Sequence, residues 1–174
     1  MSADLPGEPV DGGSWLTARQ LMHDYQAADP GQVRGAFDRD AALEGHDMLL
    51  QIRFGPLRIH SGVRVGAPYD EVRTVDGREA RVFGWSYCTL EGHFAMGEMH
   101  YQVWKWLDNG DVEFRLKAYS RSATSGPLWL RLGFRLVGRR QQLAFYRNVC
   151  RRMRRLTESQ LEMADVTRRE ERSG

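Results

Sequence analysis

The chain has 174 residues, of which 41% are hydrophobic and 28% charged, and its formal net charge is +2. These values are ordinary for one globular domain that buries about 70% of its unfolded surface. No apolar run approaches the length of a membrane-spanning helix, and the acidic start of the chain lacks the basic and apolar regions of a signal peptide. Cys88 and Cys150 are too few and too far apart for a disulfide framework or a zinc site, so we expect a cytoplasmic protein.

Two short helices are predicted near the N-terminus. Residues 1–13 are rich in Gly and Pro, which is typical of a disordered tail. Ser14 is a candidate N-cap for a helix over residues 15–28, where apolar residues recur at helical spacing. Pro30 can open a second helix at its first turn. That helix would end near residue 43 and bury Val33, Phe37 and Leu43.

From residue 47 the hydrophobic period changes towards two, which indicates strands. Asp76-Gly77 and Asn109-Gly110 are strong hairpin signals, because both positions of such a turn need positive φ. These turns predict an antiparallel meander. The expected strands cover residues 48–54, 57–65, 72–75, 78–90, 98–107 and 111–121.

The last hairpin can be given a register. If residues 109–110 alone form the turn, Trp104 lies opposite Arg115 on the outer face, where the two can make a cation–π contact. The inner face should be apolar, with Lys105 as its charged misfit near the rim. Its other residues are Met99, Tyr101, Val103, Leu107, Val112, Phe114, Leu116, Ala118 and Ser120.

The strand over residues 80–90 has two faces that the sequence does not orient. One face carries Phe83, Trp85, Tyr87 and Thr89, and the other carries Val82, Gly84, Ser86 and Cys88. A face of small residues on a curved sheet leaves space, so it would create a cavity if it lay inside.

Residues 126–171 follow helical spacing, with a break expected near Gly133 and Gly138. This helix is the only predicted element long enough to cover an antiparallel sheet with one apolar face. The fold class is therefore predicted to be α+β, a helix-grip fold as in START-like and Bet v 1-like proteins. The domain would span residues 14–156, before a charged helical extension or tail over 157–174. The expected buried stripe of the helix is Leu132, Leu136, Leu143, Tyr146, Cys150 and Met153.

Three local strings sharpen this expectation. G-W-S-Y-C-T-L-E-G-H at residues 84–93 resembles the G-F-A-Y-G-T-L-P-G-H-type segment of the uncharacterised protein family UPF 0548. G-E-M-H-Y-Q-V at residues 97–103 is similar to that family's G-E-E-x-F-x-V, and A-Y-S-R-S at residues 118–122 resembles its A-F-S-R-P. The resemblance implies a START-like (SRPBCC) fold over about residues 30–153. The family has no assigned reaction, so the resemblance implies no catalytic role for any residue.

Candidate chemistry gathers in residues 85–100. Tyr87 and His93 are the catalytic candidates, because either side chain can serve as a general acid or base, or hold an enolate oxygen, at the mouth of an apolar pocket. The alternative is that Thr89 and His93 only satisfy backbone groups where the strand ends, and that Ser120 and Arg121 fix the turn between the sheet and the helix. The expected ligand-binding residues are Thr89, Cys88, Met99, Tyr101, Phe114, Ser120 and Arg121.

Two more specific kinds of site, a nucleophile–base pair and a metal site, are less favoured. Cys88 with His93 could form a nucleophile and base, but no third orienting group is evident. The same pair with Glu98 and His100 could bind a metal, but the last two share the predicted outer face and no tight metal motif is present. We therefore expect no metal and no cofactor.

The leading functional prediction is binding of a hydrophobic small molecule between the sheet and the long helix, with cyclisation or isomerisation in secondary metabolism as the reaction class. A non-catalytic lipid or metabolite carrier is the alternative. A third class is an interaction module, because residues 126–157 contain nine arginines and no acid. The face from Arg131 to Arg155 could meet an acidic carrier protein, although a solvated outer face is the commoner fate of such a run. No motif indicates sequence-specific binding of nucleic acid.

Overall fold

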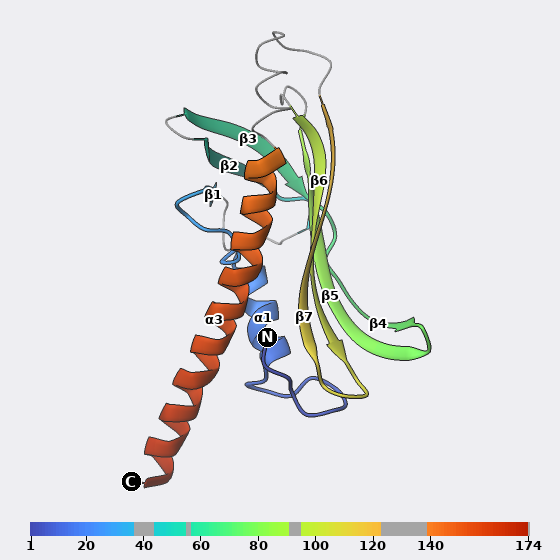
Figure 1. The fold of residues 1–174 in the computed structure, drawn as a ribbon, viewed down its shortest axis with the longest axis vertical. Coiled ribbons are helices and arrows are strands. Elements are labelled where there is room, and N and C mark those ends of the chain that lie inside the picture. The colour runs from blue at the N-terminus through green and yellow to red at the C-terminus, as the bar shows by residue number, and fades with distance from the viewer. Residues whose placement is uncertain (37–43, 55–56, 91–94, 123–138, 174) are drawn as a thin grey trace.

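The structure of the protein is a computed structural model that describes residues 1–36, 44–54, 57–90, 95–122 and 139–173. In this part of the chain, seven strands form one antiparallel sheet that curls around two helices, α1 (Ser14–His23) and α3 (Arg139–Ser173) (Figure 1). The predicted α+β helix-grip arrangement of a curved antiparallel sheet and a long C-terminal helix is confirmed. No helix among the described residues is long and apolar enough to cross a membrane.

The strand β5 pairs with three other strands of the sheet. The order is β1-β2-β3-β5-β6-β7, and β4 pairs with β5 outside this path. Because β3 pairs with the end of β5 and β4 with its beginning, the two follow each other along one edge of β5. The strands are β1 (Val33–Ala36), β2 (Asp47–Phe54), β3 (Leu57–Val65), β4 (Tyr69–Val75), β5 (Arg78–Thr89), β6 (Ala95–Trp106) and β7 (Val112–Ser122).

The two predicted turns behave differently. Asp76 and Gly77 both have positive φ, 52° and 76°, as the two-residue turn requires. At the other turn only Gly110 has positive φ, and the Trp106 N–H donates to the Asp111 carbonyl at 2.9 Å. Trp106 and Asp111 therefore close the turn, and four residues, 107–110, lie between them.

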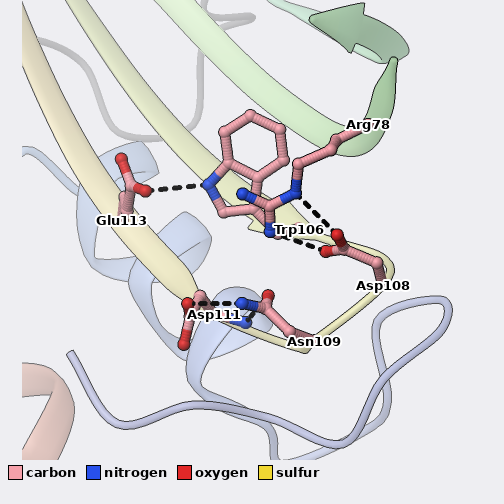
Figure 2. A network of polar contacts seen from close by, with 6 residues as sticks. All are labelled: Arg78, Trp106, Asp108, Asn109, Asp111 and Glu113. Atoms are coloured by element: carbon pink, nitrogen blue, oxygen red, sulfur yellow. Dashed lines mark hydrogen bonds and ion pairs between the residues drawn. The ribbon is translucent and has the colours of Figure 1, made fainter. Parts of the chain in front are cut away.

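The longer turn corrects the predicted register by two residues. Trp104 lies opposite Glu113 instead of Arg115, although the Arg115 guanidinium still lies 4.0 Å from the centre of a Trp104 ring. Around the turn, the Trp106 indole donates to Glu113, and Arg78 pairs with Asp108 (Figure 2). An even shift returns every side chain to the same face, so the predicted inner face is confirmed where side chains are described.

Residues 1–13, predicted to be a disordered tail, lie against the β6–β7 turn instead. The Asp4 N–H donates to the Gly110 carbonyl at 2.8 Å, and the Gly7 N–H donates to the Leu107 carbonyl at 2.7 Å. The Asp4 carboxylate also accepts the first two N–H groups of α1, from Ser14 at 2.6 Å and from Trp15 at 3.2 Å. The N-cap position is Gly13, so Ser14 is inside the helix and Asp4 supplies the cap.

The predicted helix after Pro30 is wrong where the structure describes it. Residues 33–36 form β1 and pair with β2, from Val33 opposite Ile52 to Ala36 opposite Leu49. The Asp29 carboxylate accepts the Gly31 N–H at 2.8 Å, and this local turn replaces the start of a helix. Phe37 and Leu43, which the predicted helix would have buried, lie outside the described residues.

The long helix α3 packs on α1 and β7 with a stripe of residues other than the predicted one. Val149, Met153 and Thr157 are fully buried, whereas Leu143 is 46% exposed and Cys150 is also exposed. The expected stripe is therefore wrong except at Met153 and the partly buried Tyr146. Leu132 and Leu136 lie outside the described residues. The sequence offers apolar residues on two neighbouring faces, and the packing against α1 selects between them.

The structure also orients β5. Phe83, Trp85 and Tyr87 are buried in the inner core, so the face of small residues points outwards and lines no interior cavity. On that outer face Ala80, Val82, Trp104 and Trp106 form a second buried cluster, against which Tyr69 packs. A Cβ atom at Gly84 would collide with the Tyr69 ring, so the glycine provides the place for that ring.

Candidate functional site

Five aromatic side chains meet on the inner face of the sheet, and we call them the inner aromatic cluster. Trp85 and Tyr101 stack with ring centres 4.8 Å apart and planes 18° apart. The other adjacent rings lie with centres 5.9 to 6.3 Å apart. The members are Tyr25 after α1, Trp85 and Tyr87 on β5, Tyr101 on β6 and Phe114 on β7.

The alternation of side chains along paired strands explains three of these rings. Trp85 and Tyr87 are two residues apart and therefore point to the same side of β5. In the register, Trp85 lies opposite Tyr101 and Tyr87 lies opposite Met99. Direct opposition places ring against ring, which accounts for the stacked pair.

Tyr25 enters the cluster through an unusual backbone conformation. Its φ is +54°, and the chain reverses there with the Gln26 N–H donating to the Leu21 carbonyl and the Tyr25 N–H donating to the Met22 carbonyl. This is the Schellman motif, whose left-handed position is usually glycine. A side chain in that position costs about 1–2 kcal/mol. The cost is consistent with a selected role, because this turn directs the Tyr25 ring towards Trp85 and Tyr101.

A neighbouring glycine accommodates the same ring. A Cβ atom at Gly35 would lie 3.0 Å from a Tyr25 ring carbon and 3.0 Å from the Met48 sulfur. Such distances are too short, so any larger residue at this position of β1 would push the ring or the methionine away. The chain thus uses a strained residue and a glycine together to hold one phenol over the sheet.

The cluster is apolar around its rim but carries hydrogen-bonding atoms in its interior. The Trp85 indole nitrogen is buried and has no hydrogen-bond partner among the described residues, and the Tyr101 hydroxyl, buried beside the Tyr25 and Tyr87 phenols, forms no hydrogen bond of good geometry with them. A buried polar group without a partner costs about 1–3 kcal/mol. Most buried polar groups in proteins have partners, so two such atoms on stacked rings require an explanation.

The phenols of the cluster are neutral at physiological pH. Burial raises the pKa of Tyr25 and of Tyr101 well above the usual value, and Tyr25 and Tyr87 raise the pKa of Tyr101 further. Burial also raises the pKa of Tyr87. A phenol in this state donates a hydrogen bond and is a poor base. The chemistry available here is hydrogen-bond donation to an oxygen atom within an apolar environment.

The structure brings together four of the residues predicted from the sequence. Tyr87 and Tyr101 are buried in the cluster, and Met99 and Phe114 pack against it. Cys88 is exposed on the outer face of β5. The Thr89 hydroxyl accepts the Gly97 N–H at 3.0 Å, which is the backbone-fixing role given above as the alternative.

The remaining candidates have described backbones only in part. His93 lies outside the described residues, as do the side chains of Ser120 and Arg121, whose backbones pair with β6 in β7. On the outer face His100 Nε2 and Glu98 Oε1 lie 3.1 Å apart, a contact between neighbours on the exposed side of β6. Sequence reasoning assigned no site role to Tyr25 or Trp85. The role of Tyr25 could not be predicted, because no sequence pattern indicates that a tyrosine adopts a positive φ.

A buried charge lies at the other end of the inner face. The Lys105 side chain is fully buried, and its ammonium donates to the Glu8 carbonyl at 2.9 Å and lies 3.8 Å from an Asp4 carboxylate oxygen. The predicted misfit is therefore inside, and the N-terminal segment covers it. Because its ammonium is already paired with Glu8 and Asp4, Lys105 fixes the N-terminal segment to the sheet and is not part of the inner aromatic cluster.

Comparison with known proteins gives a family and no function. Searches of curated proteins and of solved structures find no match. One family model matches residues 3–152, and it includes both the N-terminal segment and the inner aromatic cluster. A match over this share of the sequence shows that the chain belongs to the family described as Domain of unknown function (DUF1990).

Proposed function

We propose that the protein binds a small hydrophobic molecule at the inner aromatic cluster, between the sheet and the helices. The observation that supports this most directly is the pair of buried donors, the Tyr101 hydroxyl and the Trp85 indole N–H, that no described residue satisfies. Apolar binding sites typically contain a few such polar groups, which orient the ligand. A bound molecule with an oxygen atom within hydrogen-bond distance of these donors would remove the cost of leaving them unpaired.

Catalysis would follow from the same donors. Neutral phenols that point at a carbonyl stabilise the negative charge that develops on its oxygen during enolisation. Cyclisation or isomerisation of a ketone-containing metabolite is the reaction class that this chemistry and the START-like (SRPBCC) resemblance to UPF 0548 favour. Tyr101 and Trp85 would act as donors with the Tyr87 phenol beside them, and a base would have to come from another residue or from the substrate.

A carrier role and an interaction role are the alternatives. A carrier would use the same cluster without turning the ligand over. For the interaction role, Arg147, Arg151, Arg154 and Arg155 are exposed on α3, where an acidic carrier protein could dock. Arg154 already pairs with Glu158 at 3.0 Å, and Arg152 donates to the Gln26 carbonyl, so part of this face is occupied.

The test is ligand retention combined with stability. The protein and the variant Tyr101→Phe are incubated with a metabolite extract and examined by native mass spectrometry. Tyr119→Phe is the matched control, because Tyr119 is 64% exposed on the outer face of β7. We expect Tyr101→Phe to lose the retained mass while its unliganded form is as stable as the wild type or more so, because the hydroxyl has no partner to lose. Equal retention by both variants would contradict the proposal, and turnover of the retained compound would separate enzyme from carrier.

A further inference from the structure

The charges around the inner aromatic cluster restrict which molecule can bind there. Among the described residues, Lys105 is the only buried cation, and the carboxylate of Asp4 beside it is 5% exposed. Lys105 lies four residues from Tyr101 along β6, which is about 14 Å at about 3.4 Å per residue. Its ammonium already has the Glu8 carbonyl and the Asp4 carboxylate as partners. No other buried cation among the described residues is therefore available to neutralise an anionic ligand at the cluster, and Arg19, which lies over the Phe83 ring, is 42% exposed and pairs with Asp70.

The unpaired atoms restrict the ligand further. An indole N–H can only donate, so the partner missing at Trp85 has to be an acceptor. The Tyr101 hydroxyl remains protonated because burial opposes its ionisation, so it too is available as a donor. Both atoms lie at the edges of two rings that stack on each other with centres 4.8 Å apart, so a ligand would meet them edge-on among the other aromatic rings of the cluster, where flat ring systems pack well. The matching ligand is flat, uncharged and carries an oxygen acceptor.

We propose that the inner aromatic cluster selects uncharged aromatic or cyclic molecules whose carbonyl oxygen accepts hydrogen bonds from Trp85 and Tyr101, and that it discriminates against carboxylates of the same size. This inference rests on the proposed function and specifies its ligand class. A carboxylate would enter an apolar interior without a counter-charge, and burial of an unpaired charge is far more costly than burial of a carbonyl that finds donors.

Three probes of similar size test the discrimination on the full-length protein. Acetophenone carries the carbonyl, ethylbenzene carries none, and benzoate carries a charge. Their dissociation constants are measured by ligand-observed NMR titration. We expect acetophenone to bind about tenfold more tightly than ethylbenzene, as one satisfied hydrogen bond would give, and benzoate to bind at least tenfold more weakly than acetophenone.

Variants assign the effect to the donors. Tyr101→Phe keeps the stacked ring and should lower the preference for acetophenone over ethylbenzene, with the affinity for ethylbenzene unchanged; the Trp85 N–H remains and should keep part of the preference. Tyr119→Phe should leave all three affinities unchanged. If acetophenone and ethylbenzene bind equally to the wild type, or benzoate binds as tightly as acetophenone, the cluster binds apolar molecules but the donor selection is wrong. If none of the three probes binds, the inference and the proposed function both lose their support.

Discussion

Asp4→Ala is expected to be among the most damaging substitutions outside the inner core, although it removes a single carboxylate. That carboxylate is 5% exposed and accepts the N–H groups of Ser14 and Trp15 at the start of α1. Loss of an N-cap of this kind costs about 0.5–2 kcal/mol. The substitution also leaves the fully buried Lys105 ammonium without its counter-charge, and breaking a buried pair typically costs about 3–5 kcal/mol. The Glu8 carbonyl remains as a partner at 2.9 Å, so we expect about 3 kcal/mol in total.

Urea unfolding followed by tryptophan fluorescence measures this cost. In a thermal melt followed by the same signal, the melting temperature should fall by about 6–12 °C, because 1 kcal/mol corresponds to about 2–4 °C in a chain of this length. Asp4→Asn keeps an oxygen for the helix cap and removes the charge, so it separates the two contributions. Adding Lys105→Met to Asp4→Asn should restore most of the charge-dependent part, since an apolar pair of similar size leaves no buried charge. An Asp4→Ala protein within 0.5 kcal/mol of the wild type would refute the reasoning, as would independent effects in the double variant.

Three further outcomes follow from the packing, the buried phenols and a turn. Met153→Ala should lower the free energy of unfolding by about 2–5 kcal/mol, whereas Leu143→Ala on the exposed side of α3 should change it by less than about 0.5 kcal/mol in the same urea titration. The three buried tyrosines have raised pKa values, so their contribution to stability is full below pH of about 10 and is lost as pH rises further. Phenolate absorbance during an alkaline titration should therefore show a late, cooperative step that coincides with unfolding, and early, independent ionisation of all tyrosines would contradict it. Gly77→Ala should cost about 1–2 kcal/mol, measured as a shift of the urea midpoint, because φ is 76° at that position; a neutral result would mean the turn has relaxed.

The strands could be predicted because their signals are local. Period-two alternation fixed their positions, and Asp76-Gly77 fixed one turn through the φ values of two residues. The predicted β6–β7 register was wrong by two residues because the dipeptide Asn109-Gly110 occurs in hairpin loops of more than one length. The residues predicted on the inner face remained correct because a shift of two residues keeps each side chain on its face. Lys105 was correctly expected there as the charged exception.

The errors concern features that depend on residues far away in the chain. Val149 and Cys150 are neighbours in sequence, and only the packing of α3 on α1 decides which of them is buried. The strand β1 exists because β2 pairs with it, whereas its local sequence also suits a helix. Tyr87 and Tyr101, two members of the inner aromatic cluster, were among the residues predicted from the sequence. Tyr25 was missed as a site residue because its position depends on a left-handed residue where glycine is usual.

The closure by the N-terminal segment has a consequence for the order of events during synthesis. Glu8 and Lys105 are 97 residues apart in sequence, so their contact waits until most of the chain has left the ribosome. At about 5–20 residues per second, this interval is roughly 5–20 s. During that time the β6–β7 turn has not been synthesised, so Asp4 cannot be anchored to it while it caps α1. The first residues of the nascent chain therefore have no sheet to pair with. A large folded fusion partner placed before Met1, which itself packs against the core, would compete with this late docking step. A fusion after residue 173, at the far end of α3 in Figure 1, would not compete with it.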